Sequence, residues 1–282
     1  MILNYIHWNA DPVMFHLGNI PVRWYSILLG TGFITGYIFA SFIFKKENVD
    51  RYILESYGIW IIIGVMIGGR LGHCLFYEFD YYIHNPLEMI KPWTGTLGKD
   101  AEFTGFRGFS SHGWIAGLFI TLWINSRLKK VPFLWALDRF AIVAVLAGAF
   151  VRIGNLMNSE MIGIPANVPW AFIFEKVDIV PRHPAQLYES LAYLLTFTLV
   201  YVYYNKKMNN VIKGTYTGLV LLGVFISRFF IEFLKINQIP SEAGMELNLG
   251  QKLSIPFILV GLFLIYRQKL FKRFKRFNRL IV

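Results

Sequence analysis

Ionisable side chains inside long apolar runs are the residues of this sequence that could do chemistry. Arg228 lies well inside the apolar run at residues 215–234, and Glu232 follows four residues later on the same helical face. A charge inside a bilayer costs at least about 2.5–3.5 kcal/mol on insertion scales, so such groups usually face a bundle interior and mark function. Three further ionisable residues lie inside or at an end of an apolar run: Arg70, Arg152 and His112.

The chemistry that these residue types favour is the binding of an anion. Guanidinium groups are the preferred bidentate partners of phosphate, and several of them around a cavity open to lipid suit a phospholipid head group. The polar segment at 152–160 adds amide donors and one possible base, Glu160. Helical spacing predicts that Arg152 and Asn155 lie on adjacent turns. The cations and polar residues expected toward one side are Arg152, Asn155, Asn158, Glu160, Arg182, Arg228 and Lys235.

Each of these residues also has a structural explanation, which spacing alone leaves open. For Arg228 and Glu232 the alternative is an intrahelical ion pair that only makes the span tolerable. For Arg70 and Arg152 it is snorkelling of the guanidinium to the membrane interface. For His112 it is an ordinary interfacial position. The sequence therefore proposes an anionic-lipid site without excluding a purely structural role.

The elements that must position these residues are membrane-spanning helices. The chain has 282 residues, of which 55% are hydrophobic and 16% charged, and its mean hydropathy is +0.47. Soluble domains usually carry about 25% charge, and an apolar run of about 20 residues spans a bilayer. We therefore predict an all-α polytopic membrane protein with about seven transmembrane helices and a small outer-face cap. The expected spans are 22–44, 57–77, 112–124, 133–151, 185–204, 215–234 and 253–266.

The net charge of +11 comes from basic residues at the ends of the apolar runs. This pattern indicates membrane topology and contact with anionic membrane lipids rather than nucleic acid. The basic loops alternate, so the positive-inside rule predicts an outer N-terminus and a cytoplasmic C-terminus. The predicted organisation is a single transmembrane domain at 1–282, outer loops at 78–111 and 152–184 forming arm and head elements, and a basic cytoplasmic tail at 267–282.

Other patterns bound what the chain can be. Cys74 is the only cysteine, so neither a disulfide framework nor a thiolate metal site is possible. The sequence has no P-loop, His-Glu-x-x-His or Gly-x-Ser-x-Gly motif, so we predict no metal or cofactor, and the missing motifs argue against a nucleotide-driven pump or zinc protease. Glycines that recur at four-residue spacing predict close helix packing: Gly64, Gly68 and Gly72, and Gly113 and Gly117.

Seven segments resemble, in order, the motifs of the bacterial prolipoprotein diacylglyceryl transferase family. The resemblance extends over residues 22–266, and the longest match is the family signature at 152–163. The segments are Val22-Arg-Trp-Tyr25, Gly68-Gly-Arg-Leu-Gly72, Ser111-His-Gly113, Arg152-Ile-Gly-Asn-Leu-Met-Asn-Ser-Glu-Met-Ile-Gly163, Arg182-His-Pro-Ala-Gln-Leu-Tyr-Glu189, Ser227-Arg-Phe-Phe-Ile-Glu232 and Gly250-Gln251. Departures from the family pattern are Trp114, where a second glycine is usual, Val151 and Ser159 in place of signature glycines, and Lys235, where arginine is frequent.

The resemblance implies a transferase of the bacterial inner membrane. Such an enzyme moves the diacylglyceryl group of phosphatidylglycerol to the lipobox cysteine of a prolipoprotein signal peptide, and releases glycerol phosphate. The family's essential residues correspond here to Tyr25, His112, Arg152, Asn155, Asn158, Glu160, Arg228 and Glu232. We expect catalytic roles for His112, Arg152, Arg228, Tyr25 and Glu160, and substrate binding by Arg152, Asn155, Asn158, Arg228, Glu232, Lys235, Arg70 and Gln251.

Two other functions compete with this interpretation. A lipid flippase or transporter would place charged spans along a pathway, and predicts internal repeats and broken helices. The sequence has no convincing repeat, and its polar residues concentrate toward one side. A phosphatidyl-group transferase that uses a nucleotide-activated lipid would need an aspartate-rich metal motif, which the sequence lacks.

Overall fold

The computed structural model describes residues 5–18, 20–91, 93–94, 102–103, 108, 110–237 and 244–278. The chain is mostly helical and divides into two compact units. The first unit comprises Met1–Ile43 and Leu137–Val282, and the second comprises Phe44–Ala136.

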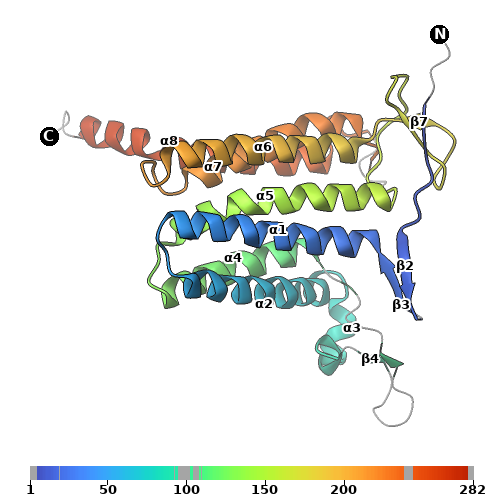
Figure 1. Cartoon of the computed structure of the whole chain (residues 1–282), viewed down its shortest axis with the longest axis horizontal. Helices are drawn as coiled ribbons and strands as arrows, with labels where there is room; N and C mark the ends of the chain where they lie inside the picture. The colour runs from blue at the N-terminus through green and yellow to red at the C-terminus, as the bar shows by residue number, and fades with distance from the viewer. Residues whose placement is uncertain are drawn as a thin grey trace. The chain divides into compact units, whose positions relative to one another are not determined.

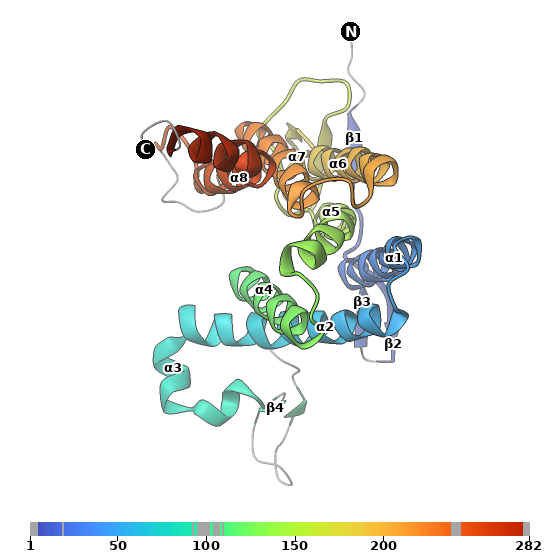
Figure 2. The same ribbon diagram turned by 90° about the vertical axis from the view of Figure 1, so that its left-hand side faces the viewer.

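The first unit is a layered bundle of long helices (Figure 1). Helix α7 packs against both α6 and α8, and the three form a row in the end-on view of Figure 2. Ser190 Oγ on α6 donates to the Ala149 carbonyl of α5 over 3.1 Å, and α1 approaches α5 at Gly32, where an added Cβ would lie 3.2 Å from Ala147 Cα. The helices are α1 (Trp24–Lys46), α5 (Phe133–Met157), α6 (Ala185–Lys207), α7 (Thr215–Ile231), the 3-10 turn η2 (Glu232–Leu234) and α8 (Leu249–Asn278).

A small sheet stands at one end of this bundle. Strands β1 (Ile6–Trp8), β6 (Phe172–Phe174) and β7 (Pro181–Arg182) follow the order β1-β6-β7, with β1 parallel and β7 antiparallel to β6. Its core consists of four buried apolar side chains: Leu156, Ile162, Phe172 and Phe174. A separate hairpin of β2 (Val13–Leu17) and β3 (Ile20–Arg23) leads into α1. Strands β6 and β7 both lie in the segment between α5 and α6, where the sequence predicts part of an outer-face cap.

In the second unit, two helices meet along a seam of glycines. Helix α2 (Arg51–Phe76) packs along α4 (Ser111–Leu128), as Figure 2 shows. A Cβ added at Gly68 would lie 2.4 Å from the Gly113 carbonyl, and one added at Gly64 would lie 2.6 Å from the Gly117 carbonyl. The predicted close packing of these glycines is confirmed. The remaining elements are α3 (Phe79–His84), η1 (Pro86–Met89), β4 (Trp93–Thr94) and β5 (Glu102–Phe103).

Each of the seven predicted spans falls mainly on a helix, but the count of seven membrane-spanning helices is not confirmed. Five described helices are long and apolar enough to cross a membrane: Trp24–Lys46, Arg51–Phe76, Phe133–Met157, Thr215–Leu234 and Leu249–Arg267. Helices α4 and α6 are not among them. The physical reason for α6 is that its inward face is polar, with Gln186, Glu189, Ser190 and Thr196 all buried.

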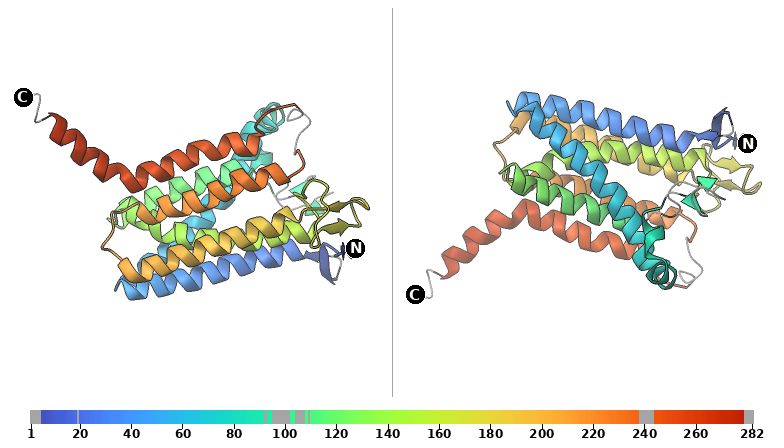
Figure 3. Two further views of the ribbon diagram at one scale, coloured as in Figure 1. Left: turned by 90° about the horizontal axis from the view of Figure 1, so that it is seen from above. Right: turned by 90° about the horizontal axis from the view of Figure 1, so that it is seen from below.

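Two predicted boundaries also change. Helix α5 continues to Met157, six residues beyond the expected end of that span, so the first six residues of the predicted loop at 152–184 are helical. Helix α8 contains Pro256 and continues well beyond the expected span (Figure 3). Part of the predicted arm at 78–111 and the last four residues of the predicted tail at 267–282 lie outside the described residues.

Candidate functional site

Five side chains of alternating charge form a continuous row in the first unit, which we call the charge chain. Arg152 Nε lies 3.1 Å from Glu189 Oε2. Glu189 Oε1 lies 2.8 Å from Lys235 Nζ, and that ammonium lies 3.1 Å from Glu232 Oε2. The same carboxylate oxygen of Glu232 lies 4.0 Å from Arg228 Nε. The row therefore joins both candidate phosphate-binding arginines.

Four elements bring these charges together. Arg152 comes from the end of α5, Glu189 from the start of α6 and Arg228 from the last turn of α7. The chain then tightens into η2, which carries Glu232, and becomes extended at Lys235. This change directs Lys235 back toward α6, because a helix that simply continued would have carried it onward along α7.

Burial divides the charge chain into an interior and two ends. The side chains of Glu189, Lys235 and Glu232 are 0%, 2% and 4% exposed, whereas those of Arg152 and Arg228 are 15% and 32% exposed. Buried charges are tolerated only when they are paired, which the three interior groups achieve with one another. The arginines keep accessible surface, so an anion could bind at the ends of the row.

A polar loop extends from the Arg152 end. Arg152 Nη1 donates to Asn155 Oδ1 over 3.4 Å, and Asn155 Nδ2 donates to Glu160 Oε2 over 3.2 Å. Asn158 Nδ2 donates to the other oxygen, Glu160 Oε1, over 3.0 Å. The Gln186 amide also donates to the Glu160 backbone carbonyl. Glu160 is thus an oriented hydrogen-bond acceptor, linked to Arg152 through Asn155.

The backbone of this loop explains two glycines of the family pattern. Ser159, which stands where the family has a signature glycine, has φ +54°. That conformation is strained for a residue with a Cβ, whereas glycine adopts it freely. At Gly163 an added Cβ would lie 2.4 Å from the His183 carbonyl and 2.7 Å from the Leu234 carbonyl. Gly163 therefore lets the loop pass between the start of α6 and the end of η2.

Tyr25 contacts α5, and Gln251 contacts α7. An added Cβ at Gly154 would lie 2.8 Å from Tyr25 Cδ2, so the tyrosine ring rests on the turn of α5 that carries the candidate residues. Gln251 is buried, and its Nε2 donates to the Phe229 carbonyl over 3.4 Å. Gln251 thus ties the start of α8 to α7, and substrate binding by Gln251 stays a prediction.

Arg182 does not join the charge chain. Its Nη2 lies 2.5 Å from Asp178 Oδ2, and its Nη1 donates to the Gly163 carbonyl over 3.3 Å. The hydrogen bond from Arg182 holds the pKa of Asp178 below its usual value. Arg182 therefore fixes the β6–β7 turn of the small sheet. Of the four cations predicted to cluster, only Arg152, Arg228 and Lys235 belong to the charge chain.

His112 and Arg70 belong to the second unit. His112 is exposed in the first turn of α4, and it lines a cavity of about 390 Å³ together with Phe76, Tyr77 and Ser110. Trp114 is half-buried. Its neighbour Gly113 makes the close contact with the glycines of α2.

Arg70 is buried rather than snorkelling to an interface. Its Nε donates to the Met89 carbonyl over 3.0 Å, its Nη2 donates to the Glu88 carbonyl over 2.8 Å, and its guanidinium lies 5.0 Å from the Tyr82 ring centroid. These contacts give Arg70 a structural role at η1, and its predicted role in substrate binding stays untested.

Sequence reasoning missed Glu189 as a site residue. It lies inside the apolar run at 185–204, so the argument that selected Glu232 from its own run applies to Glu189 as well. Its neighbours Gln186 and Tyr193 share the helical face, and the Arg152 guanidinium lies 5.8 Å from the Tyr193 ring centroid. Their three- and four-residue spacing from Glu189 was the available signal.

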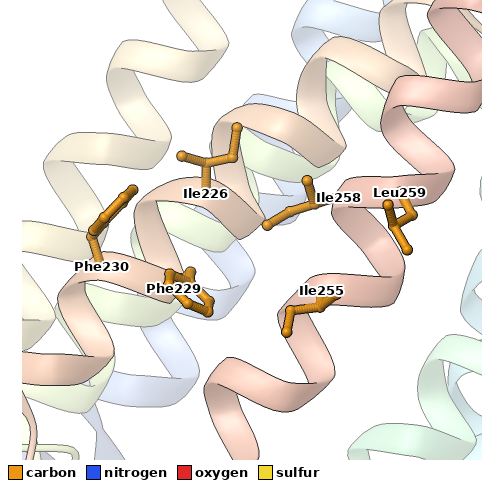
Figure 4. Close-up of a pocket in the computed structure, with 6 residues that line it drawn as sticks. All are labelled: Ile226, Phe229, Phe230, Ile255, Ile258 and Leu259. Carbon is orange, nitrogen blue, oxygen red and sulfur yellow. The ribbon is translucent and has the colours of Figure 1, made fainter. Parts of the chain in front are cut away.

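An apolar cavity of about 290 Å³ lies between α7 and α8, next to Arg228 in sequence. Figure 4 shows its six lining side chains on the two facing helices: Ile226, Phe229, Phe230, Ile255, Ile258 and Leu259. All six are hydrocarbon side chains, so the cavity suits an apolar occupant. No cluster of histidine, cysteine and acidic residues among the described residues could hold a metal ion.

Comparison with known proteins identifies the family. Residues 12–267 match the model of the prolipoprotein diacylglyceryl transferase family. This chain is similar to proteins named phosphatidylglycerol–prolipoprotein diacylglyceryl transferase. The protein from Bacteroides fragilis is 41% identical over 93% of this chain and 94% of its own, and the protein from Chloroherpeton thalassium is 40% identical over 94% of each chain. Another, from Porphyromonas gingivalis, is 38% identical over 93% of this chain and 94% of its own. The chain therefore belongs to the prolipoprotein diacylglyceryl transferase family.

Proposed function

We propose that this protein transfers the diacylglyceryl group of phosphatidylglycerol to the thiol of a lipobox cysteine in a prolipoprotein. In this reaction a carbon–sulfur bond forms as the bond between the glycerol carbon and the phosphate oxygen breaks. Glycerol phosphate leaves with the electron pair. Family membership supports this transfer over lipid flipping, since the relatives are named for the two substrates.

The observation that carries the proposal is the placement of Arg152 and Arg228 at the partly exposed ends of the charge chain. The departing glycerol phosphate is an anion, and fixed positive donors stabilise developing charge most strongly where water is excluded. We assign the lipid phosphate to these two arginines.

The thiol must become a thiolate, because the free thiol has a pKa of about 8.5. We propose His112 as the base, with the field of the arginines as the alternative. Tyr25, Asn155 and Glu160 orient the reacting groups, a role supported by the hydrogen bonds that run from Arg152 through Asn155 to Glu160.

We place the enzyme in the bacterial inner membrane, with its N-terminus outside and its C-terminus in the cytoplasm. The five apolar helices support a membrane location, and the alternation of basic loops supports the orientation. The cavity between α7 and α8 is suited to an acyl chain of the lipid, because all of its lining side chains are apolar.

The test uses purified protein in detergent with phosphatidylglycerol and a peptide that contains a lipobox cysteine. The mass added to the peptide measures transfer. Arg228→Ala should slow transfer by roughly a hundredfold or more, the usual effect of removing one electrostatic donor. The control is Arg51→Ala, which removes an arginine whose side chain is 80% exposed and should leave the rate unchanged.

Three results would contradict the proposal. Transfer by Arg228→Ala at the normal rate would remove the arginine clamp from the mechanism. Full activity of His112→Gln would mean that another group activates the thiol. If the wild-type protein left the peptide unmodified but moved lipid between leaflets, its function would be that of a flippase and not of a transferase.

A further inference from the structure

Lys235 shares each of its two carboxylate partners with an arginine. Glu189 presents Oε1 to Lys235 at 2.8 Å and Oε2 to Arg152 at 3.1 Å. Glu232 presents a single oxygen, Oε2, to Lys235 at 3.1 Å and to Arg228 at 4.0 Å. In both cases the lysine is the nearer cation, so it takes the larger share of each carboxylate.

The lysine is fixed in the interior of the site. Its side chain is only 2% exposed, and its backbone forms a bridge to Gly163. Its N–H also donates to the Glu232 carbonyl over 3.2 Å. The ammonium therefore contacts buried carboxylates, whereas the arginines at the two ends retain the accessible surface.

Counting formal charge shows what the lysine contributes. The charge chain contains three cations and two carboxylates, so its formal charge is +1. Without the lysine it would contain two arginines and two carboxylates, with a formal charge of zero. Each carboxylate would then belong to one arginine alone. Glu160, the acidic group linked to Arg152 through Asn155, accepts hydrogen bonds from the amides of Asn155 and Asn158 instead.

We infer that Lys235 is a positioning residue for the transfer reaction. It neutralises Glu189 and Glu232 from the buried side, and thereby leaves the charge of both arginines available to the lipid phosphate. The inference rests on the proposed function. It differs from the expectation that Lys235 binds substrate directly, because the lysine acts through the arginines and does not touch the lipid.

The test measures KM and kcat with varied phosphatidylglycerol. Lys235→Met should raise KM about tenfold or more, because each arginine would then be neutralised by a carboxylate of its own and would hold the lipid phosphate less strongly. Lys235→Arg should stay near the wild type because it keeps the cation. The decisive variant combines Lys235→Met with Glu232→Gln. Its charge chain again has a formal charge of +1, so its KM should fall at least about threefold below that of Lys235→Met, toward the wild-type value.

The matched control is Lys252→Met, which removes an exposed lysine of α8 and should leave KM unchanged. Thermal unfolding of every variant is followed in the same detergent. A Lys235→Met variant with wild-type KM overturns the inference. A double variant that has neither a lower KM nor a higher folded yield than Lys235→Met also overturns it. Direct lipid contact or simple packing by the lysine predicts no such rescue.

A second measurement separates failure of this inference from failure of the proposed function. Binding of the same variants to nanodiscs of phosphatidylglycerol is compared with binding to nanodiscs of phosphatidylcholine. If the wild type transfers nothing, the proposed function fails, and the lysine is judged from binding alone. Weakened binding of phosphatidylglycerol by Lys235→Met, with recovery in the double variant, supports its role. Equal binding by the wild type, single and double variants overturns it.

Discussion

Lys235 Nζ and Glu189 Oε1 lie 2.8 Å apart, although 46 residues separate them in the sequence. This buried pair joins the start of α6 to the segment that follows η2. Through Glu189 it reaches Arg152 of α5, and through Glu232 it approaches Arg228 of α7. The geometry of both arginines thus depends on one pair that neither arginine belongs to.

Removing the Glu189 carboxylate should therefore destabilise the protein as well as impair transfer. Glu189→Gln removes the carboxylate that pairs with Arg152 and leaves Lys235 with Glu232 alone, at a position where Glu189 and Lys235 are buried. Breaking a buried pair typically costs 3–5 kcal/mol, so we expect a loss of about that size. Thermal unfolding in detergent measures it. The control Glu175→Gln changes a partly exposed glutamate that pairs with His7, and should have little effect.

A negative charge at Asn155 should impair transfer with less effect on folding. The Asn155 amide donates to Glu160 Oε2 over 3.2 Å, and its oxygen accepts from Arg152. Asn155→Asp replaces that donor with a carboxylate, which would repel Glu160 and compete with phosphate for Arg152. We expect KM for phosphatidylglycerol to rise roughly tenfold. The exposed substitution Asn85→Asp is the control, and an unchanged KM in Asn155→Asp would exclude Asn155 from lipid binding.

Much of this arrangement could be predicted from the sequence, because local spacing fixes what a helix presents. Arg152 and Asn155 were expected on adjacent turns, and they are joined by a hydrogen bond. Gly64 and Gly68 were expected to permit close helix packing, and they meet α4 at backbone distance. Both predictions involve residues three or four positions apart, which helical geometry places on one face of a helix.

What could not be predicted depends on contacts between distant segments. Spacing along the sequence predicts Glu232 beside Arg228 on one helical face. In the structure the nearest cation to Glu232 is Lys235, because η2 tightens the helix before it ends. Arg182 looked like a member of the cation cluster, yet it binds Asp178 within the small sheet. Such choices between competing partners depend on tertiary packing, which spacing along one chain does not encode.

The Asp178–Arg182 pair predicts a small dependence of stability on pH. Arg182 lowers the pKa of Asp178 below its usual value, mainly by hydrogen bonding. A carboxylate with a lowered folded-state pKa stabilises the protein above the unfolded value of about 3.9, and loses that contribution as the pH falls through the folded value. Asp178→Asn should therefore have a lower Tm than the wild type at pH 7, and the gap should narrow by pH 3.

The pair is partly exposed, so the difference in Tm should be modest. Melting curves in detergent at the two pH values measure it. Arg182→Gln should flatten the same part of the profile because it removes the donor. A gap between the wild type and Asp178→Asn that is equally large at both pH values would contradict the role given to this ion pair.

Two glycines of α2 should respond oppositely to the same substitution. At Gly68 an added Cβ would lie 2.4 Å from the Gly113 carbonyl, whereas at Gly58 nothing lies within 4 Å. Gly68→Ala forces two helix backbones apart and should cost about 1–3 kcal/mol of unfolding free energy. Gly58→Ala should be neutral or stabilise by about 0.5–1 kcal/mol, because alanine loses less backbone entropy in a helix than glycine. Thermal unfolding of the two variants in the same detergent decides the matter, since equal Tm values would mean that the α2–α4 seam does not require glycine.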